Sequence, residues 1–217
     1  MFTRAGDTPL SKTTVLARAV SDSANPFFLA PAVVFTMALF QHVSILQLGF
    51  VAAISIFFYT LLPIGVLLLY KKRRFFKDYD IPDRQQRIKP YSLALLSYGI
   101  AGILISIYLP SNAYYVKYAA ICYLINPLLG FVITLGWKIS IHCASISSAA
   151  AILVMYPTSA HSSPVFFMVY YALTAFLLFL IPLMMWSRIQ LKIHTFAQVT
   201  IGTVVGYLAT TSVLVFL

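Results

Sequence analysis

Three polar segments of this sequence contain side chains that could bind and cleave a phosphoester. Segments 138–142 and 187–198 each combine a histidine with serine and a cation, and segment 71–90 adds further cations. Two imidazoles can supply a nucleophile and a proton donor near neutral pH, and guanidinium groups bind phosphate in bidentate fashion. The candidate side chains are Lys77, Arg84, Arg87, Lys138, Ser140, His142, Ser187, Arg188, His194 and Gln198.

The rest of the sequence indicates that these segments lie at a membrane surface. Hydrophobic residues make up 61% of the 217 residues and charged residues only 9%, whereas a soluble domain has about 25% charged residues. Long runs without charge, with polar breaks at 41–44 and 157–164, predict an all-α transmembrane helical bundle of seven spans, since a span needs about 20 apolar residues. The predicted spans are 24–40, 46–70, 91–109, 116–136, 140–156, 165–186 and 196–217.

Pro26 and Pro31 interrupt the first predicted span, so a count of six spans stays open. Either count predicts one transmembrane domain over 24–217, preceded by a polar segment at 1–23. Small residues such as Gly202 and Gly206 predict close helix packing rather than chemistry.

The order of the spans predicts that all three polar segments share one face of the membrane. That face receives 14 of the 15 basic residues, and only Lys117 lies on the other. The positive-inside rule assigns the crowded face to the cytoplasm of a plasma or inner membrane. The net charge of +10 flanks the spans, a pattern typical of binding to lipid head groups rather than to nucleic acid. His42 and His161 fall on the sparsely charged face, where we expect plain interfacial residues.

The motif residues resemble the type 2 phosphatidic acid phosphatase superfamily. Ser187-Arg188 followed by His194 is similar to its third motif, SRxxxxxHxxxD, and Ser140-x-His142 resembles the end of its second motif, PSGH. Segment 84–90 stands where the first motif, KxxxxxxRP, belongs, and Lys77 has the right separation from Arg84. The resemblance covers residues 71–207, about two thirds of the chain.

This resemblance implies an integral membrane phosphatase that needs no metal or cofactor and acts on a lipid phosphate or a polyprenyl mono- or diphosphate. It implies that His194 is the nucleophile that forms a phosphohistidine, and that His142 protonates the leaving alcohol. The implied phosphate-binding residues are Arg188, Arg84, Arg87, Ser140, Lys77 and Lys138.

Two departures from the family pattern affect the predicted site. Gln198 stands where the family has an aspartate that orients the nucleophile; its carbonyl can accept the same hydrogen bond but stabilises a cationic imidazole less. Ile139 and Ile141 replace the proline and glycine of the second motif.

Two other functions stay open. The acidic cluster Asp78, Asp80 and Asp83 could bind Mg²⁺ and a diphosphate, as in intramembrane prenyltransferases. Such enzymes carry two acidic motifs, and residues 91–217 contain no Asp or Glu from which to build the second. The third possibility is a non-catalytic membrane protein with a degenerate phosphatase site.

Overall fold

The computed structural model describes residues 11–73, 84–158, 161 and 163–216, and the described chain is helical without any strand. The predicted all-α class is therefore confirmed. The helices are α1 (Lys12–Ser23), α2 (Pro26–Phe40), α3 (Ile45–Ser55), the π-helix η1 (Ile56–Leu61), α4 (Leu62–Lys72), α5 (Arg84–Tyr108), α6 (Tyr114–Gly136), α7 (Ile141–Val154), α8 (Pro164–Gln190) and α9 (Phe196–Phe216).

Each of the seven predicted spans corresponds to a helix. In the described part of the chain, five helices are long and apolar enough to cross a membrane, one of them the continuous run Ile45–Lys72. The pair α1 and α2, bent by 43°, makes a sixth. Helix α7 has only 14 residues, about 21 Å at 1.5 Å per residue. The chain is an integral membrane bundle of about six spans.

Helix α5 begins at Arg84, seven residues before the predicted start of the third span. The apolar span within it, Ile88–Tyr108, agrees with the predicted third span, because counting charges locates the edge of the apolar layer, whereas the hydrogen-bonded helix continues beyond that edge. Residues 84–90 thus belong to a helix rather than to the connection before it.

Polar side chains mark the points where several helices begin. Asn25 accepts a hydrogen bond from the Phe27 N–H, and Pro26 occupies the first position of α2. Ser44 and Gln47 form a reciprocal capping box at the start of α3. These side chains satisfy N–H groups that have no partner within the helix.

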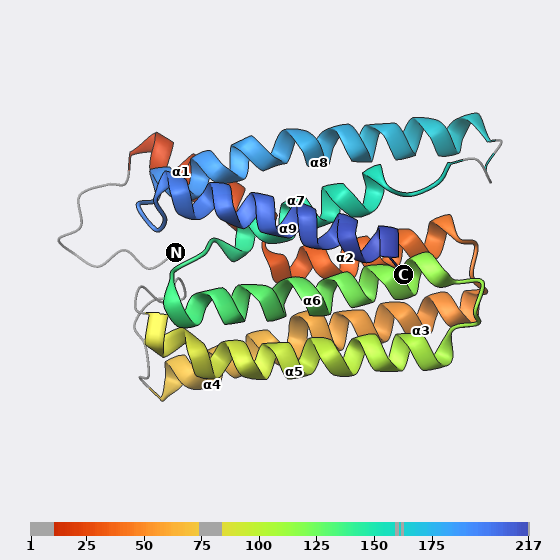
Figure 1. The fold of residues 1–217 in the computed structure, drawn as a ribbon, viewed down its shortest axis with the longest axis horizontal. Coiled ribbons are helices and arrows are strands. Elements are labelled where there is room, and N and C mark those ends of the chain that lie inside the picture. The colour runs from red at the N-terminus through yellow and green to blue at the C-terminus, as the bar shows by residue number, and fades with distance from the viewer. Residues whose placement is uncertain (1–10, 74–83, 159–160, 162, 217) are drawn as a thin grey trace.

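The helices lie side by side along the long axis of the molecule (Figure 1). Helices α2, α5 and α7 end at one end of the bundle, and α4, α6 and α8 end at the opposite end, where α1 also lies. The end of α6, the end of α8 and the start of α5 therefore lie at the same end of the bundle.

Helix α7 lies in the centre of the bundle, and all residues from Cys143 to Leu153 are buried. It packs closely on α9 because glycine leaves room for its backbone. A Cβ atom added to Gly202 would lie 2.6 Å from the Ser140 carbonyl oxygen, and one added to Gly206 would clash with the Ala144 backbone. The predicted close packing is confirmed, and it brings the start of α7 beside the start of α9.

Candidate functional site

A cavity of about 520 Å³, here called the large cavity, brings together residues from distant parts of the sequence. His142 at the start of α7, Arg188 near the end of α8, and His194 just before α9 all line it. These three residues were predicted from motif spacing, and the fold brings them to one cavity.

The connection from α8 to α9 explains the five-residue separation between Arg188 and His194. Helix α8 ends in a Schellman motif, in which the Lys192 N–H donates to the Ile189 carbonyl and the Ile193 N–H donates to the Arg188 carbonyl. Lys192 adopts the left-handed conformation (φ 55°) that this motif requires. The turn reverses the chain so that the His194 N–H also donates to the Arg188 carbonyl.

His194 is 7% exposed, and its ring orientation is set by Gln198. The His194 Nδ1 atom lies 3.1 Å from Gln198 Oε1, and the Thr195 N–H donates to the same oxygen at 3.2 Å. Since this oxygen only accepts, Nδ1 must carry the proton. The lone pair of the neutral ring is then on Nε2, which is the nitrogen that a nucleophile needs.

Gln198 also belongs to the start of α9. The Gln198 N–H donates to Thr195 Oγ1 at 3.4 Å while its side chain accepts from the Thr195 N–H. This reciprocal pair is a capping box. Gln198 therefore holds both the histidine and the helix start.

Arg188 is 3% exposed and is held by α1. Its Nη1 atom donates to Ser21 Oγ at 2.6 Å, and the neighbouring Ser187 hydroxyl donates to the Ala17 carbonyl at 2.6 Å. A buried guanidinium is costly unless hydrogen bonds or anions compensate for its lost hydration. Its position beside the large cavity suits an anionic ligand.

Helix α1 contributes cavity residues that were not predicted from the sequence. Arg18, Ser21 and Asp22 line the large cavity, although segment 1–23 was interpreted only as polar and topology-determining. The sequence signal for this helix was the N-cap serine Ser11, followed by the small residues Ala17 and Ser21 four residues apart. In the structure both of these small residues are buried. Such spacing is typical of a helix with one packed face.

Two predicted phosphate-binding residues, Ser140 and Lys138, make structural contacts. Ser140 is fully buried and caps α7 by accepting from the Cys143 N–H at 3.4 Å, and Lys138 Nζ donates to the Ile193 carbonyl at 2.6 Å. Neither lines the large cavity. The Lys138 side chain and the Ser140 backbone N–H, which donates to the Gln198 carbonyl, join the α6–α7 connection to the segment around His194.

The remaining predicted residues fall partly outside the description. The structure does not describe Lys77 or the three aspartates of the acidic cluster. It also leaves out the side chains of Arg84 and Arg87. Further along α5, Pro90 and Tyr91 line the large cavity, so the end of segment 71–90 reaches the site.

Apart from the histidines and the polar residues of α1 and α8, the lining of the large cavity is largely apolar. This apolar wall is formed by Phe27 of α2, by Pro63, Ile64 and Leu67 of α4, and by Ala94 and Tyr98 of α5. Cations and imidazoles together with an apolar wall suit an amphiphile with a phosphate head and a hydrocarbon chain.

His42 and His161 lie together at the far end of the bundle. Their rings are 5.6 Å apart, and the His161 ring stacks on Phe166 at 3.7 Å. Burial and the neighbouring His42 lower the pKa of His161. These residues belong to an aromatic cluster and do not line the large cavity.

Comparisons of this chain with protein-family models, with curated proteins and with solved structures gave no match. The resemblance to the phosphatase superfamily rests on the motif residues of the sequence.

Proposed function

We propose that this chain is an integral membrane phosphatase that hydrolyses a lipid phosphate through a phosphohistidine intermediate. The observation that carries the proposal is the shared cavity. Two imidazoles, His142 and His194, and the buried guanidinium of Arg188 line the same volume as an apolar wall. A volume of about 520 Å³ lies within the range of about 300–1,000 Å³ that is usual for small-ligand sites.

In the proposed reaction, His194 Nε2 attacks phosphorus while the bond from phosphorus to the leaving oxygen breaks. Protonated His142 donates its proton to that oxygen, so the alcohol leaves neutral. Water then attacks phosphorus while the bond from phosphorus to His194 Nε2 breaks. His142 takes a proton from this water, His194 regains its lone pair, and inorganic phosphate leaves. Arg188 and Arg18 bind the non-bridging oxygens, whose charge is held by guanidinium groups more strongly in a site that excludes water.

The apolar wall supports a lipid rather than a soluble phosphate as the substrate. With the phosphate beside His194, a hydrocarbon chain extends along Ile64 and Leu67 of α4, away from the cationic side. Helix α1 packs on α8, and α4 packs on α5 and η1. Residues of both groups line the large cavity, so a hydrocarbon chain that enters from the bilayer would pass between them.

The test is release of inorganic phosphate from purified protein with a panel of substrates: phosphatidic acid, phosphatidylglycerol phosphate, and polyprenyl mono- and diphosphates. We expect His194→Ala and His142→Ala each to lower kcat at least about 100-fold, the usual scale for a nucleophile or acid–base residue. His42→Ala, a histidine substitution at the far end of the bundle, is the matched control and keeps wild-type turnover. Wild-type turnover by His194→Ala would rule out the assigned nucleophile.

The same assay in EDTA separates the phosphatase from the prenyltransferase alternative. Histidine and arginine chemistry continues in the chelator. Loss of activity that Mg²⁺ restores would instead assign the chemistry to Asp78, Asp80 and Asp83.

A further inference from the structure

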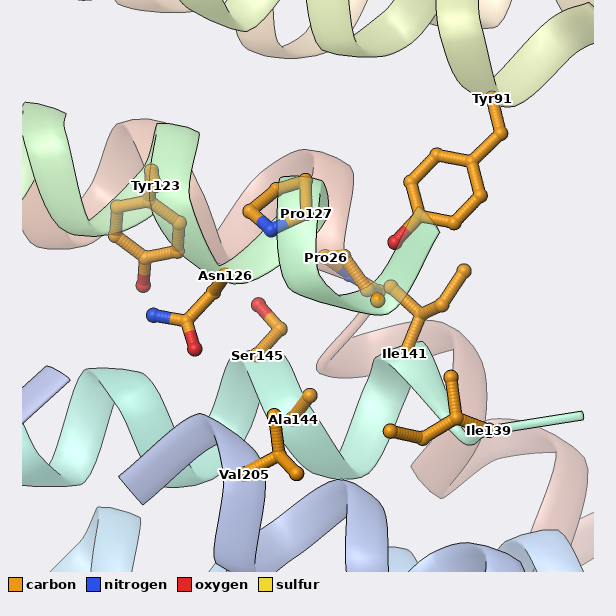
Figure 2. A pocket seen from close by; sticks show the side chains of 11 residues that line it. Pro26, Tyr91, Tyr123, Asn126, Pro127, Ile139, Ile141, Ala144, Ser145 and Val205 are labelled. Atoms are coloured by element: carbon orange, nitrogen blue, oxygen red, sulfur yellow. The ribbon is translucent and has the colours of Figure 1, made fainter. Parts of the chain in front are cut away.

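A second cavity of about 30 Å³, here called the small cavity, lies beside the large one and deeper in the bundle. Its walls include three polar side chains, Tyr123 and Asn126 of α6 and Ser145 of α7. In Figure 2, Asn126 and Ser145 point toward one another from the two helices, and the Tyr123 hydroxyl lies on the same side. Both cavities share the wall residues Pro26, Tyr91, Pro127 and Ile141.

The three polar side chains leave hydrogen-bonding capacity unused. Tyr123, Asn126 and Ser145 are 2%, 6% and 8% exposed. Among the described residues, Asn126 Oδ1 has no hydrogen-bond partner, and the Tyr123 and Ser145 hydroxyls are neighbours that interact without a well-formed hydrogen bond. An unsatisfied polar group inside a membrane costs several kcal/mol, so these groups on one cavity need an explanation.

The orientation of the Asn126 amide is fixed by its other contacts. Its nitrogen donates to the Cys122 carbonyl at 3.0 Å and to Thr210 Oγ1 at 2.8 Å. Because a carbonyl can only accept, the amide nitrogen must face Cys122 and the amide oxygen must face away. Asn126 therefore offers an acceptor that no residue of the described bundle occupies.

Pro127 leaves a second acceptor in this region, the backbone carbonyl of Tyr123. Proline has no N–H, so it cannot donate to the carbonyl four residues earlier, which belongs to Tyr123. Proline is tolerated in membrane helices where side chains or ordered water satisfy the carbonyl that it releases.

We propose that the small cavity is a binding site for water, held by Tyr123, Asn126 and Ser145. A cavity needs about 10–15 Å³ to hold a water molecule, and the small cavity exceeds this. Water donates to Asn126 Oδ1 and accepts from the two hydroxyls, which satisfies all three groups. The lining side chains are neutral, so nothing there compensates the charge of a metal cation. This site rests on geometry alone and is independent of the proposed phosphatase activity.

X-ray radiolytic footprinting with mass spectrometry tests the site, because radicals formed from a bound water oxidise the side chain beside it. Tyr59 is the control, since it is also fully buried with its hydroxyl unpartnered among the described residues, and it does not line the small cavity. We expect Tyr123 in the wild-type protein to be oxidised several times faster than Tyr59. We also expect Ser145→Val, which replaces the hydroxyl with a methyl and adds a second methyl, to lower the Tyr123 rate to that of Tyr59.

Equal oxidation of Tyr123 and Tyr59 in the wild-type protein would show a dry cavity and overturn the proposal without any variant. A Tyr123 rate that rises when choline replaces sodium in the buffer would also overturn it, by showing that a cation occupies the site.

Discussion

Gln198 makes two contacts that separate substitutions can distinguish. Its Oε1 atom contacts His194 Nδ1 and also accepts from the Thr195 N–H. We predict that Gln198→Leu lowers kcat about 100-fold or more, because the ring loses the partner that fixes its tautomer. Loss of the capping box costs about 1 kcal/mol of stability in addition.

Thr195→Val is the matched control for this prediction. It removes the Thr195 hydroxyl from the capping box but leaves the contact between His194 and Gln198. We expect a similar loss of thermal stability with near wild-type kcat in the phosphate-release assay. Equal loss of kcat in both variants would show that Gln198 acts only through the helix start.

Motif spacing could predict which residues meet but not which way each side chain turns. His142, Arg188 and His194 were predicted to lie together, and they line one cavity. Ser140 and Lys138 stand beside them in sequence, yet Ser140 caps a helix and Lys138 contacts a carbonyl. Near a helix start, a shift of one residue turns a side chain by about 100°, since a turn takes 3.6 residues.

Helix α1 borders the site, and a substitution in it can displace the helix without changing either histidine. Ala17 is fully buried and its carbonyl accepts from Ser187. We predict that Ala17→Leu pushes α1 away from α8, withdraws Ser21 from Arg188, and strongly lowers phosphate release. Ala19→Leu is the control, because Ala19 is exposed on the same helix. Equal activity of the two variants would show that α1 does not support the site.

The packing of α7 on α9 gives a prediction for stability. Gly206→Ala forces a methyl against the Ala144 backbone, and overpacking costs about 1–3 kcal/mol. Gly49→Ala in α3 meets nothing within 4 Å and gains up to about 1 kcal/mol from helix propensity. Thermal unfolding in detergent can be monitored with a dye that reacts with the buried thiols Cys122 and Cys143 as they become exposed. Relative to the wild-type protein, we expect a lower unfolding midpoint for Gly206→Ala and a higher one for Gly49→Ala.

The apolar segments were predicted well because each must exclude charge over its whole length. Helix α1 was missed because hydropathy carries no signal for a polar helix that docks through Ala17 and Ser21. The small cavity could not be predicted either, since it depends on the register of α6 against α7.

For the whole molecule, we predict that the large cavity faces the cytoplasm. The observation is the concentration of basic residues at the end of the bundle where α4, α6 and α8 end. Gln86 and Ser111 are both exposed and lie at opposite ends of the bundle. A single cysteine at either position, in a background without Cys122 and Cys143, reports the orientation. In intact cells, an impermeant thiol reagent should label the cysteine at 111 and leave the cysteine at 86 protected. The reverse pattern would turn the cavity outward and favour an extracytoplasmic lipid phosphate.

The burial of α7 has a consequence for how the protein is made. At 14 residues it is shorter than the about 20 residues that cross a bilayer. Two of its serines rely on protein contacts, since Ser147 donates to the Ala144 carbonyl and Ser148 contacts Thr210 of α9 at 2.7 Å. The insertion machinery meets α7 before α9 has been synthesised, so α7 cannot settle by partitioning into lipid alone. Nascent chains ending at Gln190 should leave α7 open to protease in microsomes or inverted vesicles, and chains ending at Leu217 should protect it. Protection of α7 in both would show that lipid alone is enough to hold it.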